Sequence, residues 1–318
     1  FTHSNAQLAA EAVRGLGVAL DSIECLACGT SIADQLMPGH ASMVQGELGL
    51  PACEVASASG VCLAGISALK YAVNGLRAGD YSRAVATGSE LSSASMQAKN
   101  FAAEIDSQID LLDKQPELAF EKDFLRWMLS DGAGALLLEN APRSDGLSLR
   151  VDWIDSMSYA GEMETCMYAG AIKCPDGQLR GWQQCNDVQR DADSVMAVKQ
   201  DVKLLNEQVV AYTVEKPLLE IIRKRKLCAD AVDYFLPHYS SNFFRDKLYA
   251  GMQLAGLDIP QARWFTNLTT KGNTGSASIY IMLDALFRSG TLRAGDRLLC
   301  YIPESGRFST AFMHLTVV

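Results

Sequence analysis

Residues 57–80 read SASGVCLAGISALKYAVNGLRAGD and give the clearest structural signal in the chain. From Gly60 to Arg77 apolar residues recur every three or four positions, which predicts an amphipathic helix. Gly79 is a typical helix stop, because glycine readily adopts the left-handed backbone conformation. A short strand at Cys53 to Ser57 precedes the helix, and an apolar strand from Arg83 to Gly88 follows it. The segment is therefore predicted to be a strand–helix–strand unit.

The end of this unit occurs twice. Leu76-Arg77-Ala78-Gly79-Asp80 recurs as Leu292-Arg293-Ala294-Gly295-Asp296, and each copy follows an apolar helix and precedes an apolar strand. The element order before the two copies also corresponds, over about a hundred residues, which indicates homologous halves. We expect an N-terminal half over residues 1–142 and a C-terminal half over 143–318, each with a mainly parallel sheet. Two such sheets that share internal helices form a layered α/β sandwich.

The composition excludes several classes of protein. The 318 residues are 48% hydrophobic and 20% charged, so the chain has enough apolar residues for a large core and is not disordered. No apolar run is long enough to span a bilayer, and we expect a soluble protein. The 28 basic and 37 acidic residues give a net charge of −9, which disfavours nucleic-acid binding.

The cysteine pattern favours reduced thiols. Nine is an odd number and most of the cysteines lie in apolar stretches, so we expect a cytoplasmic protein without disulfides. Cys25 and Cys28 lie on a predicted strand and point to opposite faces, which indicates packing more than redox chemistry. The spacing of Cys166, Cys174 and Cys185 fits no common zinc site, and we expect no metal.

Several segments outside the repeat are assigned from composition and periodicity. The polar stretch of about 92–122 is predicted to be an inserted helical excursion, and Tyr159 to Asp193 is predicted to be irregular. Val195 to Arg225 has the periodicity of one long helix, and Trp264 to Leu268 that of a short strand.

Three residues are candidates for chemistry, and each has a structural alternative. Cys62 begins the helix of residues 60–77, where the N-terminal field favours a thiolate and backbone N–H groups can hold an oxyanion; alternatively it is a small buried apolar residue. His238 follows an apolar strand, at the end where sites form in α/β sheets, or it is a hydrogen-bonded structural histidine. Asn273 begins the helix that repeats the Cys62 helix, or it is an ordinary turn residue. The repeat places Cys62 and Asn273 at equivalent, facing turns, with His238 beside them.

These residues carry a resemblance. The chain resembles the thiolase superfamily, and within it the β-ketoacyl-acyl-carrier-protein synthase III group. The similarity runs in order along almost the whole chain, through Cys62-Leu63-Ala64-Gly65, Thr87-Gly88-Ser89-Glu90, Asp131-Gly132-Ala133-Gly134-Ala135, Leu236-Pro237-His238, Gly272-Asn273-Thr274 and Ser305-Gly306-Arg307-Phe308. The resemblance implies a thiolase-like α-β-α-β-α sandwich made of two duplicated halves.

The resemblance also implies a Cys-His-Asn acyl-transfer site. Cys62 would take an acyl group from a thioester, and His238 with Asn273 would drive decarboxylation of a malonyl thioester. The resulting carbanion would attack the acyl group and give a β-keto product. Backbone N–H groups of Cys62 and Gly306 would hold the oxyanion. The substrates would be coenzyme A or phosphopantetheine thioesters, with no tightly bound cofactor, and the protein would be a homodimer.

Some residues depart from the family pattern. Tyr239-Ser240-Ser241 stands where Gln-Ala-Asn is usual, and one glycine, flanked by Ser305 and Arg307, replaces a triple glycine. The first strand of the family's fold is absent, so we expect an upstream segment. These departures suggest a specialised enzyme of fatty-acid or polyketide-type biosynthesis.

Basic residues offer a weaker interpretation. Arg245 and Lys247, with the run Arg223-Lys224-Arg225-Lys226, could dock an acyl carrier protein or coenzyme A phosphates, and Arg307 could bind a substrate carboxylate. Each is equally explained as a solvated charge or a salt bridge. Two alternatives to condensation stay open: acyl transfer to an oxygen or nitrogen nucleophile or to water, and a non-catalytic partner subunit of a condensing-enzyme complex.

Overall fold

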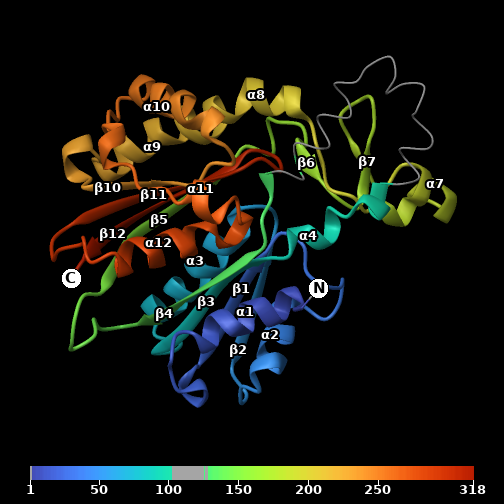
Figure 1. Ribbon diagram of the computed structural model, residues 1–318. Helices are drawn as coiled ribbons and strands as arrows, with labels where there is room; N and C mark the ends of the chain where they lie inside the picture. The colour runs from blue at the N-terminus through green and yellow to red at the C-terminus, as the bar shows by residue number, and fades with distance from the viewer. Residues whose placement is uncertain (1, 102–124, 126–127) are drawn as a thin grey trace.

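The computed structural model describes residues 2–101, 125 and 128–318 (Figure 1). Its helices in these ranges are α1 Asn5–Arg14, α2 His40–Leu48, α3 Leu63–Ala78, α4 Ser92–Ser95, α7 Asp187–Ala192, α8 Val202–Val210, α9 Lys216–Arg225, α10 Arg245–Leu254, α11 Leu268–Lys271 and α12 Ser278–Arg288. The longer strands are β1 Cys25–Thr30, β2 Glu54–Ser59, β3 Arg83–Glu90, β4 Gly132–Glu139, β5 Leu149–Ser158, β10 Tyr234–Pro237, β11 Arg297–Glu304 and β12 Ser309–Val317. The short strands are β6 Met167–Tyr168, β7 Ala171–Lys173, β8 Leu179–Gly181 and β9 Lys199–Gln200.

The longer strands form two sheets of four strands. The first has the order β2-β1-β3-β4, in which β1 pairs in parallel with β2 and β3, and β4 runs antiparallel to β3. The second has the order β10-β11-β12-β5, in which only β10 and β11 are parallel. The prediction of mainly parallel sheets is therefore wrong for the second sheet. A short turn after Glu304 returns the chain beside β11, and such a hairpin can only be antiparallel.

The sheets and helices stack in the order α-β-α-β-α (Figure 1). Helices α1 and α2 cover the outer face of the first sheet, and α8, α9 and α10 cover that of the second. Helices α3 and α12 lie between the sheets, where their apolar faces join the inner faces of both in one core. This confirms the predicted thiolase-like layering. The predicted boundary at 142/143 falls between β4 and β5, and the division into duplicated halves stays a prediction.

Helix α3 shows why the opening stretch of sequence controls the architecture. Its apolar spacing buries Ile66, Leu69 and Val73, and Gly79 ends the helix with a φ of 83° and N–H bonds to the last turn. Because α3 is enclosed by both sheets, its small residues decide how closely the layers approach.

Two glycines lie against the same backbone carbonyl oxygen. A Cβ atom added to Gly65 of α3 would lie 2.1 Å from the carbonyl oxygen of Ser276, and one added to Gly88 of β3 would lie 2.4 Å from the same oxygen. Ser276 belongs to the turn η8, Gly275–Ala277, that leads into α12. Any side chain at Gly65 or Gly88 would push the turn away from α3.

Two predicted elements need correction. The helix predicted from Val195 begins only at Val202, where the Asp201 side chain caps it, and its middle is the π-helical turn η4, Ala211–Glu215. Before it, β9 pairs with β6, a long-range contact that periodicity cannot reveal. The strand predicted from Trp264 is a single bridge to Phe235 followed by α11. Of the helical insertion predicted at about 92–122, residues 92–101 form α4 and a 3-10 turn, and the rest lies outside the described residues.

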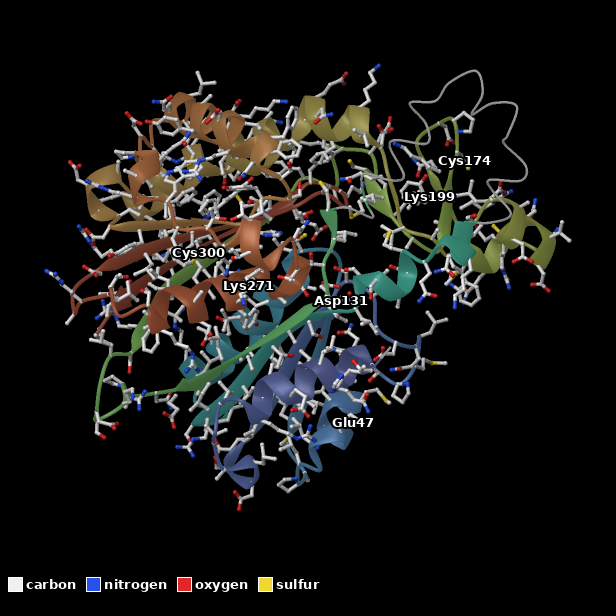
Figure 2. All side chains as sticks on the ribbon, in the orientation of Figure 1. Glu47, Asp131, Cys174, Lys199, Lys271 and Cys300 are labelled. Carbon is white, nitrogen blue, oxygen red and sulfur yellow. The ribbon has the colours of Figure 1, made fainter. Side chains whose placement is uncertain are left out.

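A lateral excursion stands beside the sandwich. It carries the short strands β6 to β9 and helix α7, at the right of Figure 1. Cys174 lies on this excursion, whereas Cys300 is buried in β11, and both are free thiols like the other cysteines of the chain (Figure 2). None of the helices in the described ranges has the length and apolarity needed to cross a bilayer.

We predict that Gly65→Ala lowers the free energy of unfolding by about 3 kcal/mol, because the added methyl group meets backbone rather than a movable side chain. Gly46→Ala is the matched control, since Gly46 lies inside α2 with nothing within 4 Å of an added Cβ. It should be neutral or stabilise by up to about 1 kcal/mol. Denaturant unfolding measures both, and equal midpoints for the two variants would contradict the contact.

Candidate active site

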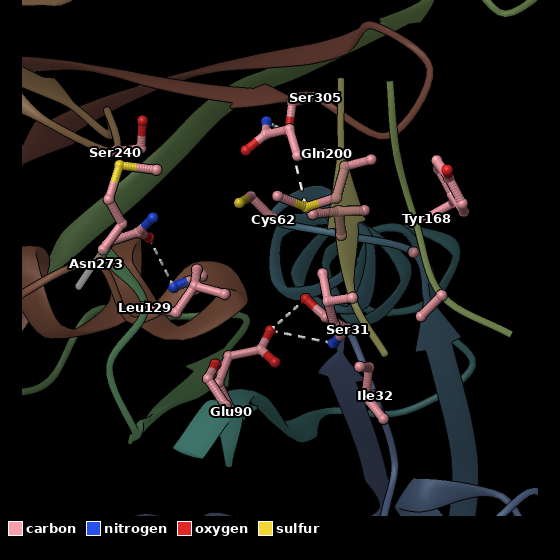
Figure 3. Close-up of a pocket in the computed structure, with 18 of the residues that line it drawn as sticks. Ser31, Ile32, Cys62, Glu90, Leu129, Tyr168, Gln200, Ser240, Asn273 and Ser305 are labelled. Atoms are coloured by element: carbon pink, nitrogen blue, oxygen red, sulfur yellow. Dashed lines mark hydrogen bonds between the residues drawn. The ribbon is translucent and has the colours of Figure 1, made fainter. Parts of the chain in front are cut away.

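A cavity of about 580 Å³ is lined by residues from both sheets and from the turns before α3 and α12, and the predicted catalytic residues are among them. Cys62, His238 and Asn273 all line it, although they come from α3, from the end of β10 and from the turn before η8. Figure 3 shows Cys62 and Asn273 on opposite sides of this space, with Glu90 and Ser31 below and Ser305 above. The structure therefore brings together the three residues that the sequence singles out.

Cys62 is the N-cap residue of α3 and is partly buried. Burial raises the pKa of its thiol, and the negative charges of Glu90 and Glu304 raise it further. These effects oppose the thiolate that the position at a helix N-terminus is expected to favour, and that expectation stays a prediction. They favour the protonated form of Cys62.

His238 directly follows β10, and its backbone N–H bonds to the carbonyl oxygen of Tyr301 at 2.8 Å. The side chain is 5% exposed, and burial lowers its pKa to about 4. The imidazole is therefore neutral near pH 7 and can donate one hydrogen bond without bringing a charge into the cavity.

Asn273 is fixed by its own turn. Its Oδ1 accepts a bond of 3.1 Å from the backbone N–H of Gly275, and its carbonyl oxygen accepts one of 2.8 Å from Ser130. Gly272 precedes it with a φ of 73°, a conformation that glycine allows. Because Oδ1 is the acceptor in this turn, Nδ2 is the group that can donate to a bound substrate.

Glu90 connects the first sheet with the Asn273 turn. Its Oε1 accepts bonds from the N–H and hydroxyl of Ser31, at 3.0 and 2.7 Å, and from the N–H of Ser276 at 3.1 Å (Figure 3). Burial raises the pKa of this carboxyl, and the serine hydrogen bonds act against that shift. Glu90 thus links Ser31, which follows β1, to Ser276 in the turn before α12.

Gly306 lies beside the first turn of α3. A Cβ atom added to Gly306 would lie 3.0 Å from Cγ2 of Val61. The carbonyl oxygen of Gly306 accepts a hydrogen bond of 2.8 Å from the N–H of Cys166. The neighbouring Arg307 is exposed, and its Nε donates to the carbonyl oxygen of Met163 at 2.7 Å. Arg307 is not among the residues that line the cavity, so the cavity lining does not support the expectation that Arg307 binds a substrate carboxylate.

The other basic candidates are held by neighbouring side chains. Arg245 donates to Gln261 at 2.8 Å and to the hydroxyl of Tyr239, which lines the cavity, at 3.3 Å. Lys247 lies 3.9 Å from the ring centroid of Phe243. In the run after Glu220, Lys224 and Arg225 both pair with Asp155 at 2.7 Å. In the described ranges no group of three or more His, Cys, Asp or Glu is placed to hold a metal ion.

Sequence reasoning missed Glu304. It ends β11, and its carboxyl lies between Gly60 and Gly306. A Cβ atom added to Gly60 would lie 3.7 Å from Oε2 of Glu304, and one added to Gly306 would lie 2.7 Å from Oε1. The sequence does offer a signal for it: Glu304 directly precedes Ser305-Gly306, the segment that resembles the family's glycine motif.

Comparisons with known proteins agree with this geometry. A family model described as 3-oxoacyl-(acyl-carrier-protein) synthase III C terminal matches residues 222–302. The beta-ketoacyl-(acyl-carrier-protein) synthase III of Koribacter versatilis is 25% identical over 93% of this chain and 77% of its own length. That of a Bradyrhizobium species is 27% identical over 92% of this chain and 78% of its own.

Solved structures show the same fold. The 3-oxoacyl-(acyl carrier protein) synthase III of Xanthomonas oryzae superposes with a TM-score of 0.76 at 21% identity, over 99% of this chain and 83% of the other. OleA of Xanthomonas campestris, solved with bound lauric acid and lauroyl-CoA, gives a TM-score of 0.75 at 20% identity, again over 99% and 83%.

The layers and the cavity between them define a thiolase-fold protein. Over most of its length the chain is similar to condensing acyltransferases of the β-ketoacyl-acyl-carrier-protein synthase III type.

We predict that iodoacetamide at pH 8 alkylates Cys228 at least about tenfold faster than Cys62, because the thiolate is the reacting form. Cys228 is exposed, whereas burial and two carboxylates keep Cys62 protonated. Peptide mass spectrometry over time measures both rates, and Cys62→Ala identifies the Cys62 peptide. Equal rates, or faster labelling of Cys62, would show that its pKa is not raised.

Proposed function

We infer that the protein joins an acyl group held on Cys62 to a malonyl thioester by decarboxylative Claisen condensation and releases a β-keto thioester. The observation that carries this proposal is that Cys62, His238 and Asn273 line one cavity from separate elements. A soft nucleophile that faces two neutral hydrogen-bond donors suits thioester exchange followed by enolate formation.

The first half-reaction loads Cys62. Its sulfur attacks the thioester carbonyl, and the carbon–sulfur bond to the donor breaks to release coenzyme A or a carrier thiol. The backbone N–H groups of Cys62 and Gly306 support the oxyanion formed on the way, since Cys62 is the N-cap residue of α3 and Gly306 lies beside Val61, the residue before it.

The second half-reaction generates the carbon nucleophile. A neutral His238 and the Nδ2 of Asn273 donate hydrogen bonds to the malonyl thioester oxygen, which gains charge as carbon dioxide leaves. Among the described residues that line the cavity none is a lysine or arginine, so no such side chain there offers a positive charge to the malonyl carboxylate. That environment favours its loss.

The cavity wall indicates an acyl substrate of substantial size. Its volume of about 580 Å³ lies within the range of small-molecule sites. Apolar residues from three regions contribute to the wall: Ile32 and Leu36, Trp182 and Met196 of the excursion, and Val209, Val214 and Phe244 of the outer helices. We propose an acyl chain bound along these residues.

The setting of the reaction is part of the proposal. The departures at Tyr239-Ser240-Ser241 and around Gly306 support a specialised fatty-acid or polyketide-type role. The free cysteines support a cytoplasmic location. Lys247 lies on α10, whose neighbours Ser240 and Phe244 line the cavity, and this position supports docking of a carrier or coenzyme A phosphate. A homodimer is expected from the family.

Incubation with a panel of acetyl-, octanoyl- and lauroyl-coenzyme A and the matching carrier thioesters should give an acyl adduct on the wild type and none on Cys62→Ala. Intact-protein mass spectrometry identifies the acyl group. An adduct on Cys62→Ala, or none on folded wild type with any donor, would overturn the nucleophile and favour a partner subunit.

His238→Ala and Asn273→Ala should still load the acyl group but should lose condensation by about 10²-fold or more, because each removes a donor to the enolate. Product analysis with and without malonyl thioester measures this step. Normal product from either variant, or acyl transfer to water without malonyl consumption in the wild type, would contradict decarboxylative condensation.

A further inference from the structure

We propose that Glu304 accepts the proton of the Cys62 thiol during loading and returns it to the departing thiolate. The proposal rests on the proposed function, because it assigns the proton path of its first half-reaction. Glu304 is then a catalytic residue supplied by β11 to a nucleophile on α3.

The position of the carboxyl group is the first argument. It lies between Gly306 and Gly60, which is two residues before Cys62, as the distances from an added Cβ at each glycine to the carboxyl oxygens show. The backbone N–H groups of Val61 and Arg307 donate hydrogen bonds to it. One of these donors is the residue immediately before Cys62, so the carboxyl is anchored at the start of α3, where a negative charge is favoured.

The second argument is the charge balance of the cavity. Cys62 has carboxylates from both Glu90 and Glu304 acting on it, and the lining in the described ranges offers no lysine or arginine. A carboxylate beside Gly306 would repel an oxyanion held there. Transfer of the thiol proton to Glu304 neutralises this carboxylate as the oxyanion forms, so the cavity never holds the additional charge.

The other acceptors near Cys62 are less suitable. Glu90 is held by three hydrogen bonds from Ser31 and Ser276. His238 is a weak base, because burial lowers its pKa to about 4, whereas burial raises the pKa of the Glu304 carboxyl above its usual value of 4.5. Arg307 follows Glu304 but directs its guanidinium to Met163. Glu304 is therefore a stronger base than His238, and it accepts two backbone hydrogen bonds where Glu90 accepts three hydrogen bonds.

The proton transfer balances without another reactant. The sulfur–hydrogen bond of Cys62 breaks and an oxygen–hydrogen bond forms on Glu304. The new carbon–sulfur bond to Cys62 replaces the donor's, and the departing thiolate takes the proton from Glu304. The carboxylate is restored when the acyl-enzyme is complete.

The test is the pH dependence of single-turnover acylation, measured by rapid quench and intact-protein mass spectrometry with the acyl-coenzyme A that labels the wild type best. Because an internal carboxylate base is already ionised, the wild-type rate should be constant from about pH 6.5 to 9. Glu304→Gln should be slower by about 10²-fold at pH 7 and should rise about tenfold per pH unit. Glu304→Asp should recover part of the flat profile.

Two controls separate this role from charge and packing. Glu90→Gln removes the same charge from the surroundings of Cys62 and should keep a flat profile, while the exposed Glu47→Gln should match the wild type throughout. A flat Glu304→Gln profile at wild-type rate, or a wild-type rate that itself rises with pH, would overturn the proposal. Acylation of Cys62→Ala would instead overturn the proposed function.

Discussion

The carbonyl oxygen of Ser276 rests against Gly65 and Gly88, and the rest of the site depends on this contact. A backbone oxygen can come so close only where no side chain intervenes. The contact fixes the turn before α12 against the start of α3, and Glu90 reinforces it by accepting the N–H of Ser276. Asn273 and Cys62 are thereby held on opposite sides of one cavity. In the part of the chain that the structure describes, the packing of buried backbone aligns the two sides of the site.

Burial acts in the same direction on the titratable groups in and beside the cavity. It opposes their charged forms, so it favours the thiol of Cys62 and the neutral imidazole of His238 and raises the pKa values of the Glu90 and Glu304 carboxyls. In such surroundings the route of a proton matters as much as the position of the nucleophile.

Much of this was available from the sequence. Apolar periodicity located α3, and the repeated Leu-Arg-Ala-Gly-Asp segment led to a layered fold, because both signals are local. The site residues Cys62, His238 and Asn273 followed from element order and family resemblance. The pairing of β9 with β6 and the antiparallel second sheet are long-range properties that local periodicity does not encode. Glu304 was missed for a related reason: its role depends on which way a strand-end side chain points and on what packs above it.

The lateral excursion has a consequence for how this protein can diversify. Trp182 and Met196 reach the cavity from the segment that carries β6 to β9 and α7, whereas Cys62 and Asn273 stand on the sandwich itself. Substitutions in the excursion can change the shape of the cavity while the glycine contacts that hold Cys62 and Asn273 in place stay the same. The shape of the cavity and the placement of Cys62 and Asn273 can therefore vary independently of each other.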